Sequence, residues 1–250
     1  MVEPLHIFVS DVHLGINDDT AKAREARFLV FLRNLPKETA GLYLLGDIFD
    51  FWVEYRDVVP RGSVRVLGEL AALSDRGVKI YFFTGNHDYW LTDYLRDEIG
   101  LEVICESLIV REIEGKRVCM GHGDGLGCRN PFARLLFSAI RNKWLVHLLK
   151  SIHPWPIFRW ARKWSSVSRN PGNRSKYIFK GKDSDFYRYI CKFGEAREID
   201  YYIFGHVHLQ LEMEVESGGT LYLLGDWAEG ASSLNLSGTN IGFGASPNMS

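Results

Sequence analysis

Five short apolar runs along the chain end in polar turns that contain glycine. The runs are 5–10, 42–46, 79–85, 117–121 and 201–205. Each has the length and apolar content of a buried β-strand that leads into a loop. Between them, 21–35 and 64–77 carry apolar residues three and four positions apart, which is typical of helices packed on a sheet. The alternation predicts an α/β layered domain whose ligands bind at the carboxyl ends of the strands.

A different pattern begins at Asn130, where a helix-like, cationic and Trp-rich stretch interrupts the alternation. Pro154 and Pro156 are expected to divide this stretch into two helices. We therefore expect one domain over 1–250, with a helical cap inserted at 130–180.

The C-terminal part of the chain contains a second pair of strand-like runs. Residues 209–218 and 220–227 predict a closing hairpin. The small and polar residues of 232–250 predict a loosely held tail.

The composition fits an ordinary globular domain. With 250 residues, 46% of them hydrophobic, the chain is long enough to bury a sizeable core. Its four cysteines form no C-x-x-C pair, so we expect neither a cysteine-based zinc site nor a disulfide framework. The N-terminus runs directly into a strand-like segment, and no stretch approaches about 18 consecutive apolar residues. We expect a cytoplasmic protein that is neither secreted nor membrane-spanning.

Charge is distributed unevenly along the chain. The formal net charge is −1, but 13 of the 30 Lys and Arg residues lie between Gly125 and Lys182, where there is no Asp or Glu. The rest of the chain carries 17 basic against 31 acidic residues. Such a basic, Trp-bearing segment could meet an anionic lipid surface, bind nucleic acid, or pack on the core while its charges keep it soluble.

Candidate chemistry lies in the five polar turns that follow the apolar runs. The turns read D-x-H at 11–13, G-D at 46–47, G-N-H-D at 85–88, G-H-G-D at 121–124 and G-H-V-H at 205–208. Carboxylate, imidazole and amide donors without thiolate suit divalent ions such as Mn²⁺, Fe²⁺ or Zn²⁺. A single His or Asp at a strand end is more often an ordinary turn residue. Five such turns in sequence favour a metal site.

This set of turns resembles the signature of the calcineurin-like metallophosphoesterase family, which it matches in order along most of the chain. The resemblance implies an α/β (α+β) fold, a four-layer αββα sandwich with an inserted helical cap. It also implies two divalent metal ions, which activate water and neutralise phosphoryl oxygens. By motif position, the ligands would be Asp11, His13 and His208 for one metal, Asn86, His122 and His206 for the other, and Asp47 as the bridge.

The resemblance also assigns roles beside the metals. His87 would be catalytic and face the substrate, as a proton donor or a charge stabiliser at the leaving oxygen. Asp88 would support catalysis by orienting a neighbouring imidazole. Asn86 and His206 would touch the substrate as well as a metal. Asp226 ends a second copy of L-Y-L-L-G-D outside the family order, so we expect it to be structural.

Within that family, the chain looks like the UDP-2,3-diacylglucosamine pyrophosphatases. The likeness rests on G-D-I-F-D-F-W at 46–52, G-N-H-D-Y-W at 85–90, H-G-D-G-L-G at 122–127, the helical insertion and G-D-W at 225–227. It implies that water attacks the α-phosphorus of UDP-2,3-diacylglucosamine to give UMP and 2,3-diacylglucosamine 1-phosphate, a step of lipid A synthesis. Mn²⁺ is the usual metal, and the expected location is peripheral on the cytoplasmic side of the inner membrane.

Substrate-binding positions of that group match this chain in part. Asn173 and Lys176 match an Asn and a Lys that follow the cap, and Asn130 takes the place of an Asp. His87 stands where many members have Arg, which keeps other phosphodiesters or phosphomonoesters, including nucleotides and nucleic acid, as alternative substrates. A non-catalytic scaffold is a further alternative, although all seven ligand positions are filled. We expect the glycolipid and the membrane surface as partners, with no obligatory nucleic acid; protein partners are not predicted.

Overall fold

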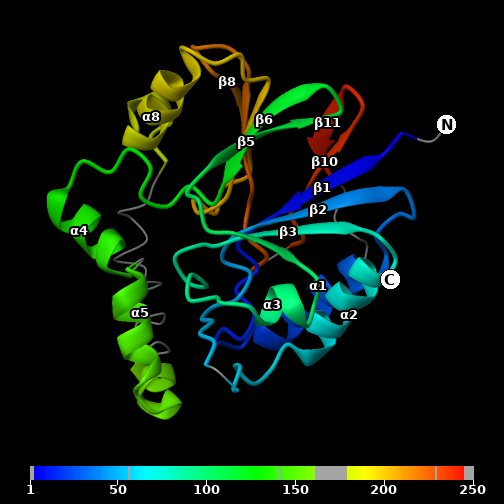
Figure 1. The fold of residues 1–250 in the computed structure, drawn as a ribbon. Coiled ribbons are helices and arrows are strands. Elements are labelled where there is room, and N and C mark those ends of the chain that lie inside the picture. The colour runs from blue at the N-terminus through cyan, green and yellow to red at the C-terminus, as the bar shows by residue number, and fades with distance from the viewer. Residues whose placement is uncertain (1–2, 56, 141, 161–178, 229, 245–250) are drawn as a thin grey trace.

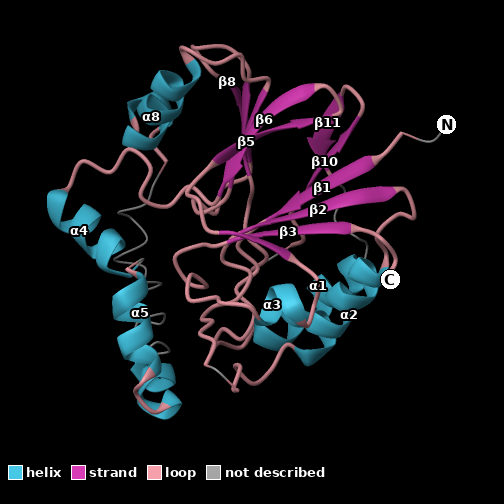
Figure 2. Ribbon diagram, viewed as in Figure 1, coloured by secondary structure: helices cyan, strands magenta, loops and turns pink. Residues whose placement is uncertain are grey.

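Two β-sheets form the centre of the computed structural model, which describes residues 3–55, 57–140, 142–160, 179–228 and 230–244 (Figure 1). The six-stranded sheet has the order β11-β10-β1-β2-β3-β4, and the five-stranded sheet has the order β5-β6-β7-β9-β8. Figure 2 shows helices outside the sheets rather than between them. The expected α/β sandwich of two sheets is confirmed.

The six-stranded sheet carries the first three sequence-predicted strands. Its strands are β1 (Leu5–Val9), β2 (Thr39–Leu45), β3 (Lys79–Phe83), β4 (Glu102–Ile104), β10 (Leu234–Ser237) and β11 (Asn240–Phe243). β1 to β4 are parallel, because a helix or a long loop connects each to the next. The helices on this side are α1 (Ala21–Arg33), α2 (Val64–Asp75) and α3 (Tyr94–Asp97).

The five-stranded sheet contains the remaining two predicted strands at its centre. Its strands are β5 (Ile109–Ile113), β6 (Lys116–Gly121), β7 (Tyr201–Phe204), β8 (Leu211–Glu214) and β9 (Thr220–Leu223). β6 is parallel to β7, and β8 and β9 form the predicted antiparallel hairpin. A short 3-10 helix, η2 (Gly181–Asp183), precedes α8 (Asp185–Gly194), which lies on this side.

Three hydrophobic clusters fill the spaces between the layers. One joins α1 and α2 to the first sheet through residues such as Phe28, Leu70 and Trp227. The second lies between the sheets, where Phe8 and Ile203 are fully buried. The third joins α8 to the second sheet. The layers therefore run helix, sheet, sheet, helix, and the parallel strands bring their carboxyl ends to a shared edge.

The expected loosely held tail is wrong for the residues that the structure describes there. β10 pairs with β1, and β11 pairs with β10, so this segment extends the first sheet. Leu234 and Leu236 have no exposed surface. Burial of alternate side chains against the other sheet holds the hairpin, and Gly238, with φ of 55°, makes its turn.

The cap begins with α4 (Pro131–Ile140) and α5 (Lys143–Lys150), followed by a helical segment at 154–160. Pro154 starts that segment, so the break at the prolines is confirmed. The expected two helices are three helical segments, because α4 ends at Ile140 and α5 begins at Lys143. In Figure 1 these helices stand beside the sandwich rather than on a sheet face. Within the parts of the chain that the structure covers, no helix combines the length and apolar character needed to span a bilayer.

Candidate active site

The five sequence-predicted turns meet at the carboxyl ends of their strands. Asp11 and His13 follow β1, Asp47 follows β2, Asn86, His87 and Asp88 follow β3, His122 follows β6, and His206 and His208 follow β7. Backbone hydrogen bonds tie the first two turns together, because the N–H groups of Asp11 and His13 donate to the carbonyls of Gly46 and Asp47. The two sheets thus deliver their polar turns to one place.

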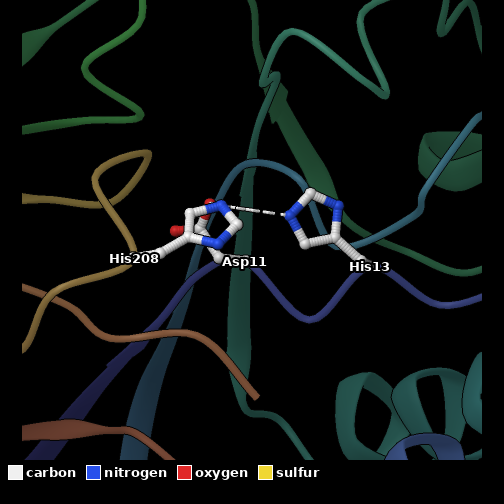
Figure 3. Close-up of side chains that lie close together, drawn as sticks. All are labelled: Asp11, His13 and His208. Atoms are coloured by element: carbon white, nitrogen blue, oxygen red, sulfur yellow. Dashed lines mark hydrogen bonds and ion pairs between the residues drawn. The ribbon is translucent and has the colours of Figure 1, made fainter. Parts of the chain in front are cut away.

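The first group of donors consists of Asp11, His13 and His208 (Figure 3). His208 Nε2 lies 3.2 Å from Asp11 Oδ1 and 3.4 Å from His13 Nε2. Donors about 2.1 Å from a shared ion in tetrahedral geometry lie about 3.4 Å apart. The two imidazoles point toward one another across such a gap, so the residues fit a divalent cation.

The second group gathers around Asp47. Asp47 Oδ2 lies 3.4 Å from His122 Nε2, which in turn lies 3.3 Å from Asn86 Oδ1. The His206 ring packs beside the His122 ring, with centroids 5.1 Å apart. Asp47 Oδ2 also lies 3.9 Å from His13 Nε2 of the first group. One carboxylate oxygen therefore faces both groups, as a bridging ligand would.

Glycines allow the turns to approach this closely. A Cβ on Gly85 would lie 2.1 Å from Asp47 Oδ1, and one on Gly205 would lie 2.6 Å from Asp11 Oδ2. Either contact would push a carboxylate out of its place. The G-N-H-D and G-H-V-H turns therefore need glycine for steric reasons at the site itself.

Five of the proposed ligands have left-handed backbone conformations. These are Asp11, His13, Asp47, His206 and His208, with φ between 51° and 67°. This region is unfavourable for residues with a Cβ, least so for Asp and Asn. Such strain is typical of functional sites, where the surrounding structure enforces it.

The carboxylates and imidazoles shift one another's pKa values. Burial raises the pKa of Asp11 and Asp47, but the facing imidazoles outweigh it, so both pKa values lie below the usual range. Burial lowers the pKa of His122 and His208, but Asp47 and Asp11 outweigh it. The pKa of His122 rises well above its ordinary value and that of His208 rises to about 10. Burial lowers the pKa of His13 to about 3.

Metal binding is expected to release protons from this cluster. In the metal-free protein the raised pKa values of His122 and His208 favour protonated rings, whereas a ligating imidazole must be neutral. Calorimetric titration of metal-free protein with Mn²⁺ in buffers of different ionisation enthalpy should show about two protons released for two ions. Affinity should fall as the pH is lowered; affinity independent of pH between 6 and 8 would contradict the assignment.

His87 faces the same cluster from the G-N-H-D turn. Its Nδ1 lies 2.8 Å from the Asp50 carbonyl oxygen, which can only accept, so Nδ1 carries a proton. Its Nε2 lies 4.0 Å from Asp47 Oδ2. Asp50, whose carboxylate lies 3.7 Å from His13 Nδ1, was not singled out from the sequence. The sequence feature that could have identified Asp50 is its position in the motif G-D-I-F-D-F-W.

Asp88 has contacts different from those expected. Its carboxylate is fully buried and accepts hydrogen bonds from the backbone N–H groups of Asp47, Ile48, Phe49 and Gly85. Burial and the neighbouring Asp47 raise its pKa to about 7. The expectation that it orients an imidazole is replaced by a different function: Asp88 joins the β2 turn to the β3 turn.

The remaining candidate residues lie elsewhere or gain a different role. Asn130 is exposed, and its side chain accepts the Phe132 N–H at the start of α4. Asn173 and Lys176 lie outside the described residues. Asp226, expected to be structural, lies 3.1 Å from His208 Nδ1 through its Oδ2. The sequence feature that could have identified Asp226 is the second copy of L-Y-L-L-G-D, which places Asp226 after β9 as the first copy places Asp47 after β2.

Comparison with known proteins agrees with this geometry. The family model described as calcineurin-like phosphoesterase matches residues 7–210. The UDP-2,3-diacylglucosamine hydrolase of Porphyromonas gingivalis is 39% identical, over 88% of this chain and 89% of its own. The enzyme of the same name from Actinobacillus succinogenes is 27% identical, over 94% and 97% of the two chains.

Among solved structures, a dimetal phosphatase from Danio rerio has the same fold. It matches with a TM-score of 0.51 at 11% identity, over 98% of this chain and 96% of its own. The family match extends from β1 to the turn after β7 and so includes all five turns with the candidate ligands. The chain belongs to the calcineurin-like phosphoesterase family.

Proposed function

We propose that this metal-dependent hydrolase cleaves the pyrophosphate of UDP-2,3-diacylglucosamine to UMP and 2,3-diacylglucosamine 1-phosphate. The observation that carries the proposal is the 39% identity, over nearly the whole of both chains, with a protein named for that substrate. The convergence of the seven donors at the strand ends supports it, because this reaction needs a phosphoryl group to be neutralised beside a nucleophile.

The residues divide the work between holding metals and handling the substrate. Asp11, His13 and His208 hold one divalent ion, Asn86, His122 and His206 hold the other, and Asp47 lies between them. The bound ions supply Lewis acidity toward the phosphoryl oxygens and lower the pKa of water. Mn²⁺ is the proposed metal, since the donors are oxygen and nitrogen without sulfur; Fe²⁺ and Zn²⁺ are the alternatives.

His87 acts at the leaving oxygen. The Asp50 carbonyl fixes its Nδ1 proton and thereby its ring orientation, and its Nε2 faces the donor cluster. When protonated at Nε2, it offers a hydrogen bond and a positive charge to the departing phosphate. Phosphate is a good leaving group, so charge stabilisation suffices and Arg can replace His at this position in relatives.

The cap supplies an apolar and basic surface for a lipid substrate. Its exposed apolar side chains are Phe132, Leu135, Trp144, Leu148, Ile152, Trp155 and Trp160. Ile157 and Phe158 instead pack against Val53, Trp90 and Phe51 of the core. Plain packing thus accounts for part of the apolar content only. We propose that the exposed part meets acyl chains and the cytoplasmic face of the inner membrane.

The substrate proposal is tested by product analysis. Mn²⁺-loaded protein in ¹⁸O-labelled water should release UMP from UDP-2,3-diacylglucosamine, with the label in UMP. UDP-N-acetylglucosamine, which lacks the two acyl chains, is the comparison substrate and should react far more slowly. Turnover of a chromogenic phosphodiester or a nucleotide without turnover of the lipid would favour the alternative substrates.

The cap surface gives a separate prediction. The double variant Phe132→Ser and Trp144→Ser removes two apolar side chains that are 82% and 85% exposed. We expect weaker sedimentation with anionic vesicles and a KM for the lipid raised about 30-fold or more, because burial of each of the two rings contributes about 1–2 kcal/mol and about 1.4 kcal/mol is a factor of ten. Hydrolysis of a soluble chromogenic phosphodiester should be unchanged.

Val64→Ser is the matched control, since Val64 is 74% exposed on α2, away from the cap (Figure 1). If both variants bind vesicles as the unmodified protein does, the cap is not the membrane-binding surface.

A further inference from the structure

The carboxylate of Asp226 contacts the far side of the His208 ring. Asp226 follows β9, and its Oδ2 lies 3.1 Å from His208 Nδ1. A carboxylate can only accept here, so Nδ1 carries the ring proton. The lone pair of the neutral ring is then on Nε2.

His208 Nε2 faces the first group of donors. It lies 3.2 Å from Asp11 Oδ1 and 3.4 Å from His13 Nε2 (Figure 3). The imidazole therefore stands between the Asp226 carboxylate on one side and the proposed metal position on the other. This carboxylate–imidazole–metal order is the one that fixes tautomer and ring orientation in metal sites.

Surrounding residues restrain the side chain of His208 less than those of His13 and His122. Its side chain is 34% exposed, whereas those of His13 and His122 are 4% and 1% exposed. His122 is further held by the Leu45 carbonyl, 2.9 Å from its Nδ1. A half-exposed imidazole on a left-handed turn samples several rotamers unless a partner holds it, and Asp226 is that partner.

The turn that bears Asp226 is itself fastened to the site. Asp226 Oδ1 accepts the Ala228 N–H at 3.1 Å. The Trp227 N–H donates to the Asp11 carbonyl at 3.4 Å, and Arg27 donates to the Trp227 carbonyl at 2.6 Å. The carboxylate is thus positioned relative to Asp11, which belongs to the same donor group as His208.

We infer that Asp226 is a positioning residue for the first metal, acting through His208. It fixes the Nδ1–H tautomer, directs Nε2 to the ion and raises the basicity of the ligand. The inference rests on the proposed function through the role of His208 as a ligand. It adds to the site a residue from the turn after β9, a strand that is followed by none of the predicted ligands.

The test measures metal binding by the variants Asp226→Ala and Asp226→Asn. Metal-free protein is titrated with Mn²⁺, and free ion is followed by electron paramagnetic resonance. We expect Asp226→Ala to weaken one of the two sites about 10- to 100-fold and to leave the other unchanged. Asp226→Asn should lose less Mn²⁺ affinity, since the side-chain oxygen of Asn can still accept a hydrogen bond from His208 Nδ1.

Steady-state kinetics give a second readout. At limiting Mn²⁺ kcat should fall, and excess Mn²⁺ should restore it with little change in KM for the lipid. Asp97→Asn, an exposed carboxylate paired with Arg96, is the control. The inference is overturned if Asp226→Ala binds both Mn²⁺ ions with the affinities of the wild-type protein. Wild-type protein that binds two ions but leaves the lipid intact contradicts the substrate proposal alone.

Discussion

Asp47→Asn is expected to reduce kcat/KM by at least about 10³-fold while leaving the metal-free fold intact. Asp47 Oδ2 lies 3.4 Å from His122 Nε2 and 3.9 Å from His13 Nε2, so its charge faces both donor groups. The neutral amide keeps the size of the side chain, and Asn tolerates the left-handed φ of 52° at this position. The loss therefore reports the missing bridging charge and not a backbone change.

Three measurements define that result. Rates are measured at saturating Mn²⁺, metal stoichiometry is measured after gel filtration, and thermal unfolding is compared without metal. We expect fewer than two retained ions and a metal-free melting temperature close to that of the unmodified protein. Asp97→Asn again serves as the control, being the same chemical change at an exposed site. Retention of more than a tenth of the activity with two bound ions would falsify the bridging role.

Asp88→Ala is expected to destabilise the protein by about 4 kcal/mol or more. The variant leaves four buried backbone N–H groups without their acceptor, and each such loss costs about 1–3 kcal/mol. The turns after β2 and β3 would separate, so activity should fall together with stability. Urea unfolding of metal-free protein measures the first effect without a contribution from bound ions.

Asp88→Asn separates the hydrogen bonds from the charge. The single side-chain oxygen of Asn can accept hydrogen bonds from only some of the four backbone N–H groups. The free energy of unfolding of Asp88→Asn should therefore lie between those of Asp88→Ala and the unmodified protein. If instead Asp88→Ala unfolds within about 0.5 kcal/mol of the unmodified protein, the carboxylate is not what joins the two turns.

The sequence predicted well where the candidate ligands lie in the fold, because strand direction determines it. Apolar runs before Asp11, Asp47 and Asn86 form parallel strands, and parallel strands bring their ends to one edge. Strand direction was therefore enough to predict that the turns meet, whereas their division into two groups of ligands came from the family resemblance. Distances and the direction of each side chain depend on left-handed turns, which periodicity does not encode.

The failures have identifiable physical causes. The last hairpin was missed because Leu234 and Leu236 alternate with polar residues over only four positions, and their burial depends on the opposite sheet. Asp88 was assigned to an imidazole by the family resemblance, but its carboxylate accepts hydrogen bonds from the backbone of the neighbouring turn. Asp226 belongs to the site through pairing of β9 with β7, a long-range contact.

The left-handed ligands also make the scaffold a candidate for stabilisation once catalysis is no longer required. Each of His13, His206 and His208 holds a conformation that costs a residue with a Cβ about 1–2 kcal/mol, and Asn lowers that cost. A redesigned, metal-independent version with Asn at these positions should tolerate hotter conditions than its parent. The backbone conformations that place the candidate ligands therefore lower the thermal resistance that this topology could otherwise reach.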